Sequence, residues 1–407
     1  MQKMRKMKAS GIEWIGEIPE GWEVVPVKRL CTMQAGKNLT SEQIAPEGTY
    51  PVYGGNGIRG FFSDYNCDGQ FLTVGRQGAL CGNVHKINGK VWATEHAVIT
   101  TPSSYTILDF LYYLLIGMDL NQYVSSTAAQ PGLAVGTLLN LKTCYPCSTL
   151  EQTQISNYLN AKCSEIDTML SKTRASIEEY KKLKQSVITQ AVTKTIYDDF
   201  GNPSKFRKLR SLCDVLSKGT TPKDIETQND EFYCIRYLKS ENIVSNQLNL
   251  NPTFFITAET NNSLERSKLN SGDILFVIAG ASIGKVAITT ADFLPANTNQ
   301  AVAFIRLSSS YQYATKYIWY FLQSDVVKQL IALSAVQSAQ PNLSLEDLGA
   351  MRLPLPDQMG CLKITDYLDA KCAEIDKLIA KKEQLVKELE SYKKSLIYEV
   401  VTGKREV

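Results

Sequence analysis

A ten-residue segment occurs twice in this chain, and its repetition constrains the architecture more than any other feature. Residues 158–167 read YLNAKCSEID and residues 367–376 read YLDAKCAEID, so eight of the ten positions are identical. The same offset of 209 residues also pairs Lys184, Ser186, Ile188, Val192 and Thr193 with Lys393, Ser395, Ile397, Val401 and Thr402. The two segments keep a common register over about 45 residues, which indicates an internal duplication.

The similarity continues upstream of the repeated segments and then fades. Residues 129–131 return as residues 339–341, both reading AQP, and Leu138 and Pro146 correspond to Leu348 and Pro356 at the same offset of 210. Farther back, residues 27–31 resemble residues 209–213 at an offset of 182, which places about 28 extra residues inside the second copy. The predicted order is a first module (1–150), a helix (151–197), a second module (198–350) and a second helix (351–407).

Both repeated segments place apolar residues three and four positions apart, as coiled-coil helices do. Ser148 and Glu151 have the spacing of a capping box at the first helix start. Beyond Ile155 and Ile364, neither segment contains Gly or Pro before Gly201 and Gly403. At about 1.5 Å per residue, such a helix is a rod of about 65 Å. We expect an α+β fold with strand-rich modules at opposite ends of two antiparallel helices, related by a pseudo-two-fold axis.

Composition describes an ordinary globular protein, with 44% hydrophobic and 21% charged residues. The net charge is only +3, and basic and acidic residues are nearly balanced in each module and each helix. Any nucleic-acid-binding face must therefore be a local patch formed by folding. The longest apolar run, residues 107–118, is shorter than the roughly 20 residues of a membrane span, so we predict a buried helix there.

Ten cysteines follow no regular spacing, and no secretion signal precedes them. Free thiols and a cytoplasmic location are therefore expected. Cys144 and Cys147 form a CxxC pair of the kind found in redox and metal sites. The matching place in the second copy reads LPLP, so the shared architecture does not require this pair, and its role stays open.

Module one combines short apolar stretches with turns rich in Gly and Asn, which is typical of β-strands joined by tight loops. The stretches 53–60 (YGGNGIRG) and 71–78 (FLTVGRQG) place polar side chains beside glycines. Arginine can pair with guanine, and asparagine or glutamine with adenine. Four side chains are therefore candidate base-reading residues, although ordinary solvent-exposed turns would give the same pattern: Asn56, Arg59, Arg76 and Gln77.

Module two offers its candidates in three segments, 216–223 (LSKGTTPK), 237–243 (YLKSENI) and 281–286 (ASIGKV). Residues 280–285 superficially resemble a phosphate-binding loop, but the spacing is too short and Val286 replaces the required Ser or Thr. A loop that offers backbone N–H groups and Lys285 to a DNA phosphate remains reasonable. The candidate DNA-binding residues are Lys218, Thr220, Thr221, Lys239, Ser282 and Lys285.

The sequence shows no catalytic motif among those with a known mechanism, such as G-x-S-x-G, H-E-x-x-H or G-x-G-x-x-G. His85 and His96 both lie in module one, so the two modules share no histidine site. The aromatic stretches around residues 108–115 and 318–322 have helical spacing and are interpreted as core. We predict no catalytic residue and no metal site.

Several segments together resemble the specificity subunits of type I restriction–modification enzymes. Residues 10–22 (SGIEWIGEIPEGW) resemble the N-terminal segment of that family, and 218–222 (KGTTP), 272–275 (GDIL) and 282–286 (SIGKV) resemble its target-recognition signatures. Gln130-Pro131, followed by Glu151-Gln152, resembles the entry to its helical repeats. The second helix departs from this pattern, since it begins with Asp357-Gln358 where Glu-Gln is expected.

The resemblance implies a non-catalytic subunit whose two target recognition domains each read one half of a split, asymmetric DNA site. It further implies that the helices set the gap between the halves and dock two DNA-methyltransferase subunits, which restriction subunits can join. S-adenosylmethionine, ATP and Mg would then be bound by the partner subunits and not by this chain. The residues assigned to docking on the repeated helices are Tyr158, Glu165, Asp167, Tyr367, Glu374 and Asp376.

Two other interpretations remain open at the level of sequence. A coiled-coil adaptor that binds only protein partners would fit the balanced charge. A fused methyltransferase is a third hypothesis, but no cofactor motif supports it. The recognised bases, the length of the gap and the presence of restriction subunits do not follow from the sequence.

Overall fold

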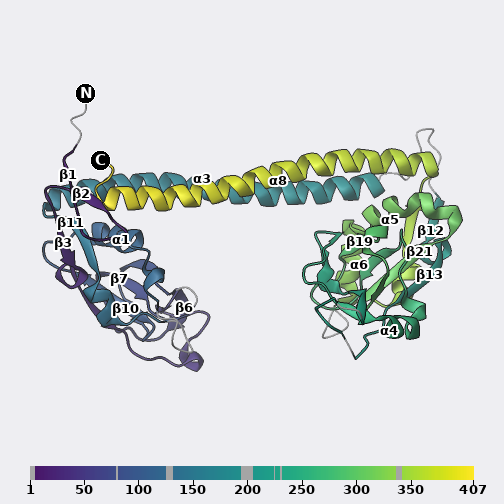
Figure 1. The fold of residues 1–407 in the computed structure, drawn as a ribbon, viewed down its shortest axis with the longest axis horizontal. Coiled ribbons are helices and arrows are strands. Elements are labelled where there is room, and N and C mark those ends of the chain that lie inside the picture. The colour runs from purple at the N-terminus through teal and green to yellow at the C-terminus, as the bar shows by residue number, and fades with distance from the viewer. Residues whose placement is uncertain are drawn as a thin grey trace. The chain divides into compact units, whose positions relative to one another are not determined.

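The structure, a computed structural model, describes residues 5–78, 81–124, 132–193, 205–223, 225–229, 232–335 and 342–407 (Figure 1). Its contacts divide the chain into two compact units. Unit 1 comprises Met1–Arg174 and Gln384–Val407, and unit 2 comprises Ala175–Glu383. Each unit therefore combines one module with a part of both long helices. The four predicted segment boundaries and the placement of the modules at opposite ends stay predictions.

The central sheet of unit 1 has four antiparallel strands in the order β4-β10-β7-β8. They are β4 (Cys31–Ala35), β10 (Ala97–Pro102), β7 (Gln70–Gly75) and β8 (Val84–Asn88). A second sheet has β5 (Tyr50–Gly54) between β6 (Gly57–Phe62) and β9 (Trp92–Ala93), with β9 parallel to β5. Two further pairs are β1 (Met7–Ala9) with β2 (Glu17–Pro19), and β3 (Trp22–Pro26) with β11 (Lys142–Pro146).

Unit 2 repeats both larger sheets and the β3–β11 pair of unit 1, whereas the β1–β2 pair has no counterpart among the described strands of unit 2. Its four-stranded sheet has the order β13-β21-β18-β19, from β13 (Cys213–Lys218), β21 (Val302–Leu307), β18 (Ile274–Val277) and β19 (Val286–Ile288). The second sheet has β14 (Tyr233–Leu238) between β17 (Phe255–Thr257) and β20 (Ala296–Thr298), with β20 parallel to β14. The remaining strands form the pairs β12 (Lys205–Lys208) with β22 (Arg352–Leu355), and β15 (Ile243–Val244) with β16 (Gln247–Leu248).

The extra length predicted inside the second copy has a structural counterpart. In unit 1 a two-residue turn joins β5 to β6, whereas in unit 2 the β15–β16 hairpin lies between β14 and β17. The short helices are α1 (Leu108–Gly117) and α2 (Val135–Asn140) in unit 1, and α4 (Ala258–Ser263), α5 (Thr315–Leu322), α6 (Asp325–Ala335) and α7 (Leu345–Ala350) in unit 2. Insertion at a hairpin leaves the shared sheet intact, because both central sheets keep the same strand order.

The long helices are α3 (Thr149–Thr193) and α8 (Gln358–Val401). The helix in the predicted segment 351–407 begins only at Gln358, because residues 352–355 form the strand β22 before it. Ser148 Oγ accepts a hydrogen bond from Glu151 N at 3.4 Å, but the Glu151 carboxylate contacts Arg5 and accepts from Trp22 Nε1 at 3.0 Å. Only half of the predicted capping box forms, because the carboxylate ties the helix start to the N-terminal segment instead.

The helix parts within each unit pair antiparallel through ion pairs that the repeat makes equivalent. In unit 1, Lys393 Nζ lies 2.6 Å from Asp167 Oδ1. In unit 2, Lys184 Nζ lies 2.7 Å from Asp376 Oδ2, and both residues of this pair are related to the first by the offset of 209. The antiparallel direction follows in unit 1 from a second ion pair, Arg174 with Glu390. The predicted α+β fold with two long antiparallel helices is confirmed at the level of each unit.

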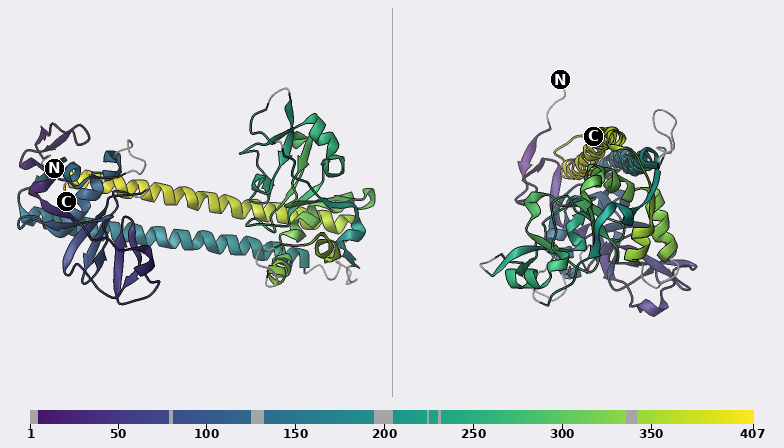
Figure 2. Two further views of the ribbon diagram at one scale, coloured as in Figure 1. Left: turned by 90° about the horizontal axis from the view of Figure 1, so that it is seen from below. Right: turned by 90° about the vertical axis from the view of Figure 1, so that its right-hand side faces the viewer.

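Each unit buries its own hydrophobic core, to which residues of its strands and of its helices contribute. Figure 2 shows these strands and helices in two further views. The regularly spaced apolar residues of α3 and α8 contribute to these cores, including Leu159 and Ile166 in unit 1 and Ile188 and Leu368 in unit 2. The aromatic stretches on α1 and α5 are buried, as predicted. Within the described part of the chain, no helix combines the length and apolar character needed to cross a membrane.

The CxxC pair lacks the features of a redox site. Cys144 is fully buried on β11, and its thiol donates to the Val401 carbonyl at 3.8 Å. Burial raises the pKa of Cys144 to about 12 and also raises the pKa of the exposed Cys147. Reactive cysteines need a lowered pKa, so Cys144 acts as a small core residue.

Candidate nucleic-acid interface

A glycine follows the first strand of the central sheet in both units and allows two backbones to touch. A Cβ on Gly36 would lie 2.2 Å from the Ala93 carbonyl oxygen, and one on Gly219 would lie 1.8 Å from the Thr298 carbonyl oxygen. The next residue then donates a backbone hydrogen bond to the same carbonyl, from Lys37 at 3.0 Å and from Thr220 at 3.2 Å. Any side chain at these positions would separate the turn from the neighbouring segment.

The described residues of the loop after β7 make the same backbone contacts as their equivalents in the loop after β18. Arg76 N donates to His96 O at 3.0 Å, and Ile278 N donates to Ala301 O at 2.9 Å. Each loop contains two glycines with positive φ, namely Gly78 (+92°) and Gly82 (+93°) in unit 1 and Gly280 (+86°) and Gly284 (+86°) in unit 2. The loop that superficially resembled a phosphate-binding loop is thus a hairpin connection that both units possess.

In unit 1 the β5–β6 turn is fixed to the loop between β7 and β8. Asn83 Nδ2 donates to Asn56 Oδ1 at 2.6 Å, and a Cβ on Gly55 would lie 2.7 Å from the Gln77 carbonyl oxygen. Arg59 is exposed and lies against Gly54. The structure thereby brings together all four residues predicted from module one. We call residues 36–38, 54–59, 76–78, 81–83 and 94–96 loop cluster 1.

Loop cluster 2 is the equivalent set in unit 2, residues 219–221, 278–285 and 299–301. Thr220 and Thr221 are exposed, and the Thr221 hydroxyl forms a hydrogen bond with Gln300 Oε1. Ser282 and Lys285 lie in the β18–β19 loop, and Lys218 is the exposed last residue of β13, directly before Gly219. Five of the six residues predicted from module two therefore belong to this cluster or border it.

Lys239 differs from the other predicted residues because its ammonium group is engaged inside its own module. It lies 3.4 Å above the Phe254 ring and 4.0 Å from Glu241. A cation over an aromatic face is stabilised where it lies. The geometry thus favours a structural contact for Lys239, and its role in DNA binding stays a prediction.

Sequence reasoning missed the segments that face the glycine turns. Glu95 and His96 lie between β9 and β10, and Asn299 and Gln300 lie between β20 and β21. The residues around Glu95 (WATEHAVI) show too little alternation of apolar and polar side chains to predict that residues 94–96 connect two strands. A signal was nevertheless present, since Gly36 and Gly219 both follow the first central strand, and a glycine in such a place often marks a close backbone approach.

The six residues predicted for partner docking fall into two equivalent sets on α3 and α8. Lys162 binds Glu165 at 2.9 Å, and Lys371 binds Glu374 at 3.1 Å, each on the exposed face of its helix. Asp167 and Asp376 form the ion pairs between the helices, and their role in docking stays a prediction. Tyr367 is 51% exposed, whereas its equivalent Tyr158 is half-buried. Both helix starts expose an apolar residue at the same repeat position, Leu150 and Met359.

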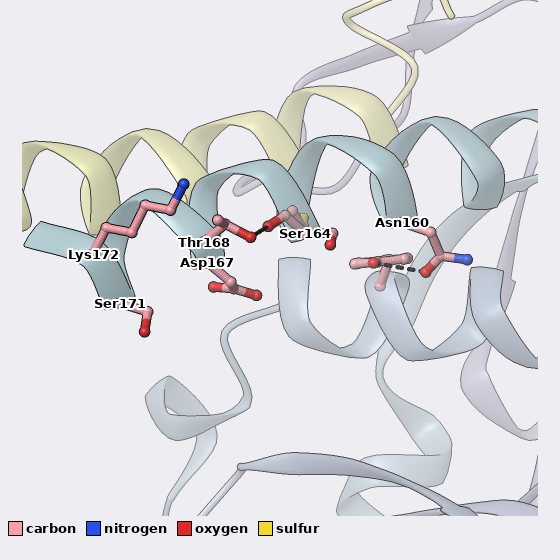
Figure 3. Close-up of a pocket in the computed structure, with 8 residues that line it drawn as sticks. Asn160, Ser164, Asp167, Thr168, Ser171 and Lys172 are labelled. Carbon is pink, nitrogen blue, oxygen red and sulfur yellow. Dashed lines mark hydrogen bonds between the residues drawn. The ribbon is translucent and has the colours of Figure 1, made fainter.

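A polar groove in unit 1 lies beside α3 and is lined by residues including Asn160, Asp167, Ser171 and Lys172 (Figure 3). Tyr113 on α1 donates to Asn160 Oδ1 at 2.9 Å, and Asn160 Nδ2 donates to Asp109 Oδ2 at 2.7 Å. Burial raises the pKa of the Tyr113 hydroxyl, which keeps it a donor.

Unit 2 contains the equivalent contact, because Tyr320 on α5 donates to Asp369 Oδ1 at 2.7 Å. The groove therefore lies at hydrogen bonds that attach the short helix of a module to a long helix. Across the described ranges, no group of three or more His, Cys, Asp or Glu side chains is placed to hold a metal ion.

Comparison with known proteins agrees with this arrangement. Residues 19–179 and 202–388 match the family described as type I restriction modification DNA specificity domain. The specificity subunit of the type I restriction enzyme EcoprrI from Escherichia coli is 41% identical over 161 residues, covering 39% of this chain and 38% of that subunit. The MjaVIII specificity subunit from Methanocaldococcus jannaschii is 23% identical over 416 residues, covering 95% of this chain and 93% of that one. The EcoprrI match thus spans well under half of that protein.

Two solved structures share the fold. A chain from a study of complex assembly and conformational transition of the type I R-M system gives a TM-score of 0.71 at 14% identity, covering 95% of this chain and 99% of that one. The HsdS subunit from Thermoanaerobacter tengcongensis gives a TM-score of 0.50 at 15% identity, covering 95% and 98%.

The two modules share the strand order of their central sheets, and each carries a cluster of polar loops. Together with the family match, this arrangement is that of a duplicated DNA specificity domain. The family match covers both copies. The chain belongs to the type I restriction modification DNA specificity family.

Proposed function

We propose that this chain is the sequence-reading subunit of a type I restriction–modification complex and that each module reads one half of a split, asymmetric DNA site. The observation that carries the proposal is the equivalence of the two loop clusters. The backbone contacts of Gly36 and Gly219, and those of Arg76 and Ile278, are the same in both units. The side chains around them differ, as expected of one scaffold that reads two different sequences.

We also propose that α3 and α8 set the gap between the half-sites and dock two DNA-methyltransferase subunits, with restriction subunits as possible further partners. Two equivalent exposed surfaces support two copies of one partner, since Leu150 and Met359 are 69% and 60% exposed at matching positions. In this proposal the chain performs no catalysis and works in the cytoplasm. S-adenosylmethionine, ATP and Mg are bound by the partner subunits.

Salt dependence of DNA binding tests the proposal against the alternative of an adaptor that binds only protein. Phosphate contacts release counterions, so the affinity of the complex with its methyltransferase subunits should fall by about a thousandfold between roughly 50 and 200 mM salt. The measurement is a fluorescence titration of the cognate duplex against a scrambled duplex. Absence of sequence-selective binding at every salt concentration would favour the adaptor.

Lengthening α3 should lengthen the gap in the recognised sequence. Four residues inserted after Glu179 add about 6 Å of helix, which corresponds to about one or two base pairs at roughly 3.4 Å each. Methylation mapping should show a longer gap with both half-sites unchanged. Replacing Glu178, Glu179, Lys181 and Lys182 with alanine keeps the helix length and should keep the gap. An unchanged gap after insertion would show that α3 does not set the spacing.

A further inference from the structure

The corner before the second central strand occupies the same place in both loop clusters. In unit 1, Ala97 at the start of β10 pairs with Gly75, and in unit 2, Val302 at the start of β21 pairs with Val277. The residue before each receives the equivalent backbone hydrogen bond, at His96 O and at Ala301 O. Counting back one more residue places Glu95 and Gln300 at equivalent positions.

Glu95 has an unusual environment for a surface carboxylate. Its Oε1 lies 3.1 Å from His96 Nε2, and its side chain is 36% exposed. Its Oε2 is buried and meets no hydrogen-bond donor within the described part of the chain. A buried carboxylate oxygen without a donor is costly. The carboxylate therefore gains a hydrogen bond if it rotates towards a donor supplied by a ligand.

Two basic residues, Lys37 and Arg76, lie on backbone segments that contact the segment carrying Glu95, and their charge offsets the repulsion that a carboxylate meets near DNA. Lys37 is exposed on the glycine turn that contacts the Ala93 carbonyl, and Arg76 is half-buried next to the His96 carbonyl. Basic side chains at such positions suit phosphate oxygens. A carboxylate on the segment that these residues contact suits a base edge, because glutamate accepts from the N4 amino group of cytosine in the major groove.

Gln300 occupies the position in unit 2 that is equivalent to Glu95. Its side chain is exposed, and its Oε1 forms a hydrogen bond with the Thr221 hydroxyl. That hydroxyl belongs to the turn held in place by Gly219, so the amide has a defined orientation. A glutamine amide pairs with adenine through one donor and one acceptor.

We propose that Glu95 and Gln300 are matched specificity-determining residues, with Glu95 accepting from a cytosine in one half-site and Gln300 pairing with an adenine in the other. This assignment rests on the proposed function, since it requires each module to read DNA. Each module is thus assigned one base position, which is a cytosine for Glu95 and an adenine for Gln300.

The test exchanges the two side chains in the full chain assembled with its methyltransferase subunits. Duplexes randomised at both half-sites are selected for binding and sequenced. Glu95→Gln should move the preference at one position of one half-site from cytosine to adenine by about tenfold or more, and leave the other half-site unchanged. Gln300→Glu should produce the reverse change in the other half-site only.

Glu47→Gln is the matched control, because Glu47 is exposed in the same module but lies near the open end of the β5–β6 hairpin, away from loop cluster 1. This variant should select the wild-type sequence. If the wild-type complex selects no sequence, the proposed function fails.

If the wild type selects a split site and both exchanges leave it unchanged, or weaken all sequences equally, the assignment of Glu95 and Gln300 is wrong. Gln300→Glu alters an exposed side chain, so an unchanged preference in this variant overturns the matched pair even if Glu95→Gln does not fold.

Discussion

Gly75→Ala is expected to unfold the module of unit 1 while unit 2 stays folded. A Cβ at this position would lie 1.8 Å from the Gly55 carbonyl oxygen and 2.8 Å from its carbonyl carbon. Both are backbone atoms, so no side-chain rotation relieves the clash. Gly75 ends β7, which lies inside the central sheet between β10 and β8. Overpacking a core typically costs about 1–3 kcal/mol, and a clash between backbones should reach at least the top of that range.

Hydrogen exchange followed by mass spectrometry measures this effect separately in each unit. Amides of β7, β10 and β8 should lose protection in the variant, while those of β18 and β21 keep theirs. Gly136→Ala is the matched control in the same unit, because a Cβ there meets nothing within 4 Å and alanine favours the helix that contains it. Equal protection of both units in Gly75→Ala would contradict the close approach of the two segments.

The pairing of the long helices could be predicted from sequence because the repeat fixes which residues are equivalent. Once Asp167 is aligned with Asp376 and Lys184 with Lys393, antiparallel packing brings each aspartate to the lysine of the other copy. The apolar spacing of three and four residues indicates which helix faces are buried. These signals are local or repeated, and they survive divergence of the modules.

The loop clusters are harder to predict, because strands distant in sequence assemble them. Asn56 and Asn83 form a hydrogen bond although they are 27 residues apart in sequence, and the sequence around neither residue predicts this contact. The importance of Glu95 depends on a buried oxygen, which only the folded structure reveals. The AQP motifs at 129–131 and 339–341 lie outside the described residues, so the resemblance of Gln130-Pro131 to the entry of the helical repeats stays a prediction.

Asp273→Ala is expected to destabilise unit 2 strongly. The Asp273 side chain is only 1% exposed, and both of its oxygens accept from Arg306, at 2.8 Å from Nε and 2.7 Å from Nη2. Oδ2 also accepts from Asn270 N at 2.7 Å. Removal of the carboxylate leaves a half-buried guanidinium without its counter-ion between β18 and β21. Breaking a buried ion pair from one side typically costs about 3–5 kcal/mol.

Chemical denaturation monitored by hydrogen exchange in β18 and β21 gives the free energy of unfolding for this unit. Glu178→Ala is the control, since it removes an exposed ion pair with Lys181 in the same unit and should cost less than about 1 kcal/mol. A similar small loss in Asp273→Ala would show that water compensates Arg306 and that the pair is not structural. A large loss confined to unit 2 would also show that the two units unfold independently.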